Sequence, residues 1–242
     1  MDRMIYLSMA GAKATMQRQD VLANNLANAS TTGFRAELQA FRAVPVQGDG
    51  ASTRVYALET TTGYDATPGA VASTGRPLDV AMQGPSWLAV QGLDGTEAYT
   101  RMGSLQTGPD GTLTTAGGLT VLGDGGPISI PPNTEPTIGA DGTISVRQSN
   151  GTVNTVGRLK LVTPEAPLQR GDDGLFRAAD GDLSADPNAR LTAGALEGSN
   201  VNPIENMVAM IAAARQFEAQ MKMLQTAERD EQAAGRLLSM NP

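Results

Sequence analysis

Apolar residues near the N-terminus recur at the spacing of one helix face. The stretch from residue 2 to residue 27 has no proline, and Gln19 interrupts its apolar stripe once. The stripe consists of Ile5, Met9, Ala12, Met16, Ala23 and Leu26. Such spacing is typical of a helix that buries a narrow stripe against another helix. We therefore expect an amphipathic helix here, with a helical partner.

A second stripe of the same kind lies near the C-terminus, between residues 204 and 238. Its members are Met207, Met210, Ala214, Phe217, Met221 and Leu224. Asn202 is a good N-cap, Pro203 suits the first helical position, and Glu205 suits a capping box. These residues predict a helix that begins at residue 203.

The middle of the chain changes to a two-residue period. Apolar residues alternate in short runs, as at Leu78, Val80 and Met82, and glycine-containing turns separate the runs. The expected hairpin turns are Asp94-Gly95, Asp110-Gly111, Asp141-Gly142 and Asp180-Gly181. This pattern predicts an all-β central domain, similar to a sandwich or barrel.

The expected fold class is therefore α+β, with both terminal helices in a coiled-coil-like core domain. We expect five segments: an N-terminal helix and turn (1–35), an extended or β linker (36–75), the central β domain (76–185), a returning linker (186–202) and the C-terminal helix (203–242).

Composition removes several classes of chemistry. The chain has 242 residues, a net charge of −7, and neither histidine nor cysteine. Without these residues it lacks the commonest general base and thiolate chemistry. The acidic balance argues against nucleic acid, and no apolar run is long enough for a membrane span. We expect no enzyme, cofactor or metal site; Asp172-Asp173 is interpreted as a solvated turn, and the Asp-Gly pairs lack the period of a calcium β-roll.

Two polar segments join the helices to the middle of the chain. The first contains Asn24, Asn25, Asn28, Gly33 and Phe34, and an ordinary helix stop followed by a turn explains it about as well as a subunit contact does. The second segment contains Leu196, Ser199, Asn200, Val201 and Asn202. Amides can be buried between packed subunits if every amide is paired, so both segments are candidate contacts.

These segments resemble the axial proteins of the bacterial flagellum. Residues 24–28 and 32–35 are similar to the N-terminal signature shared by rod and hook proteins, and residues 196–202 and 215–218 to their C-terminal signature. Residues 76–84 and 98–104 are similar to the start of their β domain. Residues 170–177 and the final Leu237-Leu238-Ser239-Met240 favour the proximal-rod member over distal-rod and hook relatives.

The resemblance implies a structural subunit that assembles helically with itself and other rod proteins and transmits torque. It also implies passage through the flagellar export apparatus without a cleaved signal peptide, and a place in the periplasmic rod. The terminal helices would then be weakly ordered in the free subunit and order fully against neighbours. The alternatives are a distal-rod or hook-type paralogue, or a β-rich secreted adhesin with helical trimerisation ends.

The subunit contacts expected on this reading lie on both helices and both joining segments. They are Ile5, Met9, Ala12, Met16, Asn24, Asn25, Leu26, Asn28, Gly33, Phe34, Leu196, Ser199, Asn200, Val201, Asn202, Met207, Met210, Ala214, Phe217, Met221 and Leu224.

Overall fold

A computed structural model describes residues 2–45, 55–148 and 151–239. The chain forms two compact units, each built from segments distant in sequence. The helical unit comprises Met1–Ala27, Glu37–Thr62 and Asn202–Pro242. The β unit comprises Asn28–Ala36 and Gly63–Val201. The observed class is α+β, with a helix at each end and a β-rich middle.

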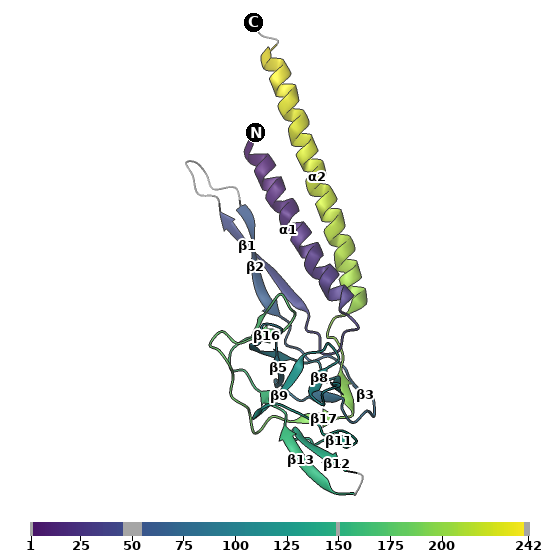
Figure 1. The fold of residues 1–242 in the computed structure, drawn as a ribbon. Helices are drawn as coiled ribbons and strands as arrows, with labels where there is room; N and C mark the ends of the chain where they lie inside the picture. Colours follow the sequence, from purple (N-terminus) through teal and green to yellow (C-terminus); the bar gives the residue numbers. More distant parts are fainter. Residues whose placement is uncertain (1, 46–54, 149–150, 240–242) are drawn as a thin grey trace. The chain divides into compact units, whose positions relative to one another are not determined.

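Two long helices dominate the helical unit. Helix α1 runs from Asp2 to Ala27 and helix α2 from Pro203 to Ser239, which confirms both predicted helices. They lie side by side and antiparallel (Figure 1). The side chain of Asn202 caps α2, since its Oδ1 accepts hydrogen bonds from the amides of Ile204 at 3.1 Å and Glu205 at 3.4 Å. Neither helix has, in its described part, the length of apolar sequence that a bilayer crossing needs.

The helical unit also contains most of a β-hairpin, which the sequence pattern did not predict. Strand β1 (Glu37–Pro45) pairs with β2 (Val55–Tyr64), in the stretch expected to be an extended linker with an edge strand. Strand β1 packs beside α1 (Figure 1). The hairpin is therefore part of the helical unit and does more than connect two domains.

The β unit contains many short strands in several small sheets. The largest sheet has the order β15-β16-β6-β5-β9-β8-β7, with β10 beside β9 and β14 beside β5. Three further sheets are β11-β12-β13, β17-β4 and β18-β3. The bounds are β3 Val71–Ser73, β4 Val80–Met82, β5 Trp87–Gln91, β6 Glu97–Thr100, β7 Leu105–Thr107, β8 Leu113–Thr115, β9 Thr120–Gly123, β10 Gly126–Pro127, β11 Glu135–Ile138, β12 Thr143–Arg147, β13 Val153–Arg158, β14 Leu161–Val162, β15 Gln169–Arg170, β16 Phe176–Arg177, β17 Leu191–Ala193 and β18 Ala195–Glu197.

Strand β5 separates two hydrophobic cores. Leu88 and Val90 point into the larger core, while Trp87 and Ala89 point into a smaller one. Successive side chains of a strand point to opposite faces, so a strand buried on both faces is a continuous apolar run. The smaller core is aromatic: the rings of Trp87 and Phe176 have centroids 4.6 Å apart.

The expected sandwich or barrel is not confirmed. The path of the largest sheet through the described residues runs from β15 to β7 and does not close on itself. Its strands have two to five residues, and a barrel needs longer paired strands with a regular stagger. The larger core is instead covered by several small sheets.

Similar short turns connect three pairs of strands in the β unit. Asp94-Gly95, Asp110-Gly111 and Asp141-Gly142 join β5 to β6, β7 to β8 and β11 to β12, and each glycine has positive φ. The prediction of a hairpin at Asp180-Gly181 is wrong, since the next strand, β17, pairs with β4. There the chain is held by a tertiary contact, in which the amide of Leu183 donates to the Tyr99 hydroxyl at 2.7 Å.

Candidate functional site

Small side chains form the seam between α1 and α2. Ser8, Ala12 and Thr15 on α1 and Ala213 on α2 are all at least nine-tenths buried. A β-carbon built on Gly11 would lie 3.1 Å from the Gln220 side chain, which places these two residues opposite one another. Small residues let the two helix axes approach closely, and the Thr15 hydroxyl is satisfied by donating to the Gly11 carbonyl at 2.8 Å.

Four methionines of the predicted stripes lie beside this seam and are exposed. Met9 is 58% exposed, Met16 56%, Met207 50% and Met221 39%. Met9 and Met16 each follow a seam residue by one position, and Met221 follows Gln220 in the same way. One position turns a helix by about 100°.

The two rows of methionines share one side of the helix pair. Because α1 and α2 run antiparallel, the same one-position step turns in opposite senses about the two axes and brings both rows to the same side. We call Met9, Met16, Met207 and Met221 the methionine face. The coiled-coil seam expected from the stripes is therefore not confirmed, because it combines residues of the seam with residues of this exposed face.

Asn25 ties the end of α1 to the start of β1. Its Oδ1 accepts from the Glu37 amide at 2.8 Å, and its Nδ2 donates to the Glu37 carbonyl at 3.0 Å. Asn24 is exposed and donates to the Glu37 carboxylate at 3.3 Å. Asn25 is thus one of the amides predicted to be buried and paired, and its partner belongs to the same chain.

In the β unit, residues 28–35 form a tight turn. The Thr31 amide donates to the Asn28 carbonyl at 3.1 Å, and Gly33 has a φ of 69°. A β-carbon on Gly33 would lie 2.3 Å from the backbone of Arg101. Glycine is therefore required here both for its positive φ and for the close approach of another backbone.

Phe34 anchors this turn against the β unit. Its side chain is buried, and the Arg170 guanidinium lies 4.6 Å from its ring centroid. Arg170 also donates to the Arg35 carbonyl at 3.3 Å. A cation over an aromatic face is attracted by the ring quadrupole, so Arg170 fixes both Phe34 and the backbone beside it.

Behind Phe34 lies a buried cluster of three charged residues, Arg35, Arg101 and Glu197. The Glu197 Oε1 pairs with Arg35 Nη1 at 2.7 Å, and its Oε2 accepts from Arg101 Nε at 2.8 Å and from Arg101 Nη2. All three side chains are at most 3% exposed. Burial, the largest influence, holds the pKa of Arg35 below its usual value, and the Glu197 carboxylate opposes this shift.

Asn200 connects three segments of the β unit. Its Oδ1 accepts from the Ala36 amide at 2.7 Å, and its Nδ2 donates to the carbonyls of Asp65 and Thr67, both at 3.0 Å. Val201 is buried close by in sequence, and the Ser199 hydroxyl accepts from its amide at 3.2 Å. The predicted residues of this segment therefore have partners within the chain.

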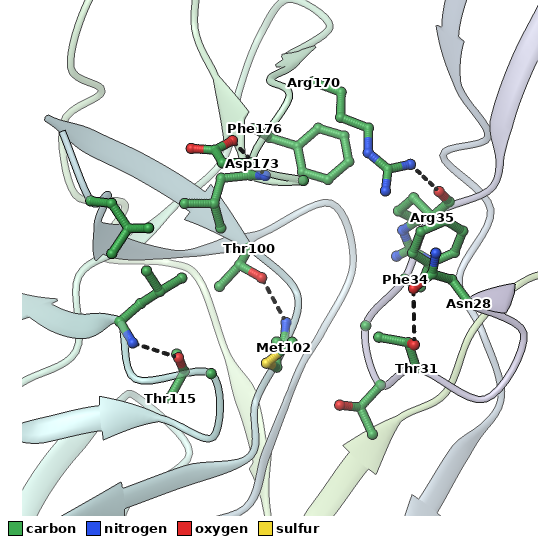
Figure 2. A pocket seen from close by; sticks show the side chains of 17 residues that line it. Asn28, Thr31, Phe34, Arg35, Thr100, Met102, Thr115, Arg170, Asp173 and Phe176 are labelled. Atoms are coloured by element: carbon green, nitrogen blue, oxygen red, sulfur yellow. Dashed lines mark hydrogen bonds between the residues drawn. The ribbon is translucent and has the colours of Figure 1, made fainter. Parts of the chain in front are cut away.

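The β unit contains a cavity of about 360 Å³ beside the 28–35 turn (Figure 2). Hairpin turns contribute Leu93, Leu119 and Leu175 to its lining. Asp173, at the rim, accepts two hydrogen bonds from Arg177 at 3.1 and 2.7 Å, and these bonds hold the pKa of its carboxyl below the usual value. The lining consists of apolar groups, hydroxyl groups and charged groups that already have partners. Such a cavity is better suited to packing contacts than to proton transfer.

The structure places eight of the predicted contact residues in two groups. The exposed group is the methionine face, while Asn25, Gly33, Phe34 and Asn200 serve contacts within one unit. The remaining predicted residues are partly buried or exposed, apart from the buried Ala12 and Val201; they are Ile5, Asn24, Leu26, Asn28, Leu196, Ser199, Asn202, Met210, Ala214, Phe217 and Leu224. Their roles as subunit contacts stay predictions.

Sequence reasoning missed the roles of Arg35, Arg101 and Glu197. A signal was present, because each charge stands in a segment that resembles the flagellar signatures, beside small or apolar residues. Among the residues described here, no three acidic side chains gather as they would around a metal ion.

Three known protein families match separate parts of the chain. The family described as flagella basal body rod protein matches residues 5–35, the flagellar hook protein FlgE/F/G D1 domain matches residues 81–146, and the flagellar basal body rod FlgEFG protein C-terminal family matches residues 192–237. The first and third matches cover most of the two terminal helices, and the second lies within the β unit.

Full-length relatives are similar over the whole chain. The flagellar basal-body rod protein FlgF of Salmonella typhimurium is 51% identical over 252 residues, and that of Escherichia coli K12 is 50% identical, each with 100% of both chains covered. The flagellar basal-body rod protein FlgG of Bacillus subtilis is 31% identical, covering 93% of this chain and 95% of its own.

Proposed function

Since this chain belongs to the flagellar basal-body rod protein family, and is most like FlgF, we propose that it joins neighbouring rod subunits through its methionine face. The chain is a structural subunit of the rod and not an enzyme. The proposal concerns how the subunit is held in the rod, and one observation carries it: large apolar side chains are exposed on helices that already pack together.

The methionine face is costly to leave in water. Fully burying a side chain of this size contributes about 1.5–3 kcal/mol, so covering four half-exposed methionines contributes roughly 1 kcal/mol each. The inner seam does not need these side chains, because Ser8, Ala12, Thr15 and Ala213 fill it. A helix of a neighbouring subunit that lies between the two rows would cover the face.

Methionine suits a contact that repeats in non-equivalent surroundings. Its unbranched, flexible side chain adapts to partners of different shape at low cost. A contact between this face and a different surface of the next subunit is heterologous, and such contacts propagate as a helical filament when they do not close into a ring. We propose that the methionine face contacts other copies of this chain as well as other rod proteins.

The proposed location is the periplasmic part of the flagellar basal body, in the proximal rod. We further propose that the chain reaches it through the flagellar export apparatus without a cleaved signal peptide. The flagellar names of the relatives and their full-length similarity support this location. The family matches favour the rod over the alternative of a secreted adhesin.

Replacing methionines of the face with a charged residue tests the proposal. We expect Met16→Glu and Met207→Glu to leave the circular dichroism and melting temperature of the purified chain nearly unchanged, because both side chains are exposed. In cells that make only the variant protein, we expect basal bodies that lack this chain and whose assembly ends before the hook forms. Normal incorporation of both variants would overturn the proposal.

Leu93→Glu is the matched control. Leu93 is 91% exposed but lies in the β unit, so the same apolar-to-charged change occurs away from the helices. We expect this variant to enter the rod and support swimming. Sedimentation of the purified wild-type chain provides a second test: a monomer agrees with a rod subunit, and a stable trimer favours the adhesin.

A further inference from the structure

Three segments of the chain meet beside Glu197 within the β unit. Residues 33–36 lead directly into β1, residues 65–70 follow β2, and residues 197–201 lead directly into α2. The chain passes between the helical unit and the β unit through residues 28–36, 63–70 and 197–201, so load carried along the chain enters the β unit there.

Backbone hydrogen bonds hold the three segments together. The Gly33 amide donates to the Glu197 carbonyl at 2.8 Å, and the Gly198 amide donates to the Ala70 carbonyl at 2.8 Å. The Asp65 amide donates to the Ala36 carbonyl, also at 2.8 Å. The crossing is too tight for larger residues, since a β-carbon on Gly69 would lie 2.1 Å from the Gly198 carbonyl oxygen.

Glu197 adds a side-chain contact to each segment. One carboxylate oxygen accepts from the Gly69 amide at 3.0 Å and pairs with Arg35, while the other is held by Arg101. Arg101 in turn donates to the carbonyls of Met82 at 2.9 Å and Gly84 at 2.8 Å, which belong to the body of the β unit. One buried carboxylate thus links all three segments to the sheets.

This cluster contains two positive charges and one negative charge. Two guanidinium groups share one carboxylate, and each side chain is almost fully buried. Removing one partner of a buried ion pair leaves an uncompensated charge, which is strongly unfavourable. Coulombic attraction in a low-dielectric interior is also strong at short range. Moving one of the segments away from the others would leave buried charges without partners, and this cost opposes their separation.

We propose that Arg35, Glu197 and Arg101 form a clamp that transmits mechanical load from the terminal helices to the β unit. The mechanical role rests on the proposed function as a rod subunit, whereas the clamp itself is a property of the isolated chain. The clamp keeps the three segments attached when they are pulled. Its loss should weaken this crossing more than it weakens the two hydrophobic cores.

Hydrogen exchange on the isolated chain tests the clamp. In Glu197→Gln, we expect the amides of Gly33, Gly69 and Asn200 to exchange roughly tenfold faster, because local opening of the crossing becomes easier. The amides of Leu113 and Leu159, which are bonded within the larger core, should keep their rates. Unchanged rates at the crossing, or equal acceleration everywhere, would overturn the clamp.

A matched control and a milder variant accompany this experiment. Glu165→Gln makes the same acid-to-amide change at an exposed bend of the β unit and should leave the crossing amides unchanged. If Glu197→Gln does not fold, Arg35→Lys keeps the charge but loses the forked geometry of the guanidinium. It should accelerate exchange at Gly33 and Gly69 in the same way, and wild-type rates there would contradict the clamp.

Pulling a single molecule by its two ends measures the load directly. The chain has no cysteine, so one cysteine added at each end provides specific attachment points. We expect the force that unfolds the β unit to fall in Glu197→Gln and to stay at the wild-type value in Glu165→Gln. An equal force in all three chains would overturn the mechanical role. Both experiments use the free chain, so their outcome is independent of the rod-incorporation test.

Discussion

Asn25 and Glu37 exchange two hydrogen bonds, at 2.8 and 3.0 Å, in which the amide side chain occupies the place of a neighbouring strand. Asn25 is 5% exposed and Glu37 is half-buried, so the two hydrogen bonds are partly shielded from water. One asparagine therefore satisfies the start of β1 and fixes it beside the end of α1.

Asn25→Ala tests this relationship. The substitution leaves the part-buried N–H and C=O of Glu37 without their partner, and we expect the free energy of unfolding to fall by about 1–2 kcal/mol. Urea denaturation followed by circular dichroism measures the change. Asn24→Ala, next to it on the exposed side, should cost less than about 0.5 kcal/mol. Equal effects of the two variants would contradict the assigned role.

Gly33→Ala should destabilise the β unit for two separable reasons. The left-handed backbone conformation costs a residue with a β-carbon about 1–2 kcal/mol. In addition, the new β-carbon would lie 2.3 Å from the Arg101 backbone, which must then shift. Gly118→Ala is the control, because Gly118 has a φ of 82° with no neighbouring atom within 4 Å. Thermal unfolding should show a clearly larger loss for Gly33→Ala, and equal losses would show that the close approach is unimportant.

The repeated turns make the β unit sensitive to acid. Threonine hydroxyls, two residues further along, donate to the carboxylates of Asp94, Asp110 and Asp141 and hold the pKa of each below its usual value of 3.8. A lowered folded-state pKa contributes stability that is present above about pH 4 and is lost as the pH falls through the lowered value. We therefore expect stability to decrease below about pH 4.

Thr112→Val tests this linkage at one turn. It removes the hydroxyl that donates to the Asp110 carboxylate at 2.7 Å, so the pKa of Asp110 should rise towards 3.8. NMR titration of the carboxyl carbon measures the pKa. Thr112→Ser keeps the hydroxyl and should keep the lowered value. A Val variant that titrates like wild type would assign the shift to another cause.

Local patterns predicted much of this fold. The apolar period and the Asn202-Pro203 cap gave the start of α2, and Asp-Gly pairs gave three hairpin turns, because these signals act within a few residues. The hairpin of β1 and β2 lacked such a signal, since part of its support is the side chain of Asn25 on α1.

Long-range pairing explains what the sequence did not reveal. The helix seam is built from Ser8, Ala12 and Thr15, and only the antiparallel partner distinguishes this side from that of Met9 and Met16. A search for large apolar residues combines the two sides into one stripe. Likewise, Glu197 meets Arg35 and Arg101 across long stretches of chain, and no local period indicates that these charges are buried together.

Cross-linking from single cysteines to amines of neighbouring subunits in assembled rods tests the assignment of the methionine face most directly. The chain has no cysteine, so Met16→Cys and Met207→Cys provide two reporters on the face, and Ser8→Cys provides one in the buried seam. Basal bodies treated with a reagent that joins a thiol to a nearby amine should contain this chain cross-linked to neighbouring subunits through residues 16 and 207, and not through residue 8. Cross-links from residue 8 alone, or none from residues 16 and 207, would contradict a rod held together through the methionine face.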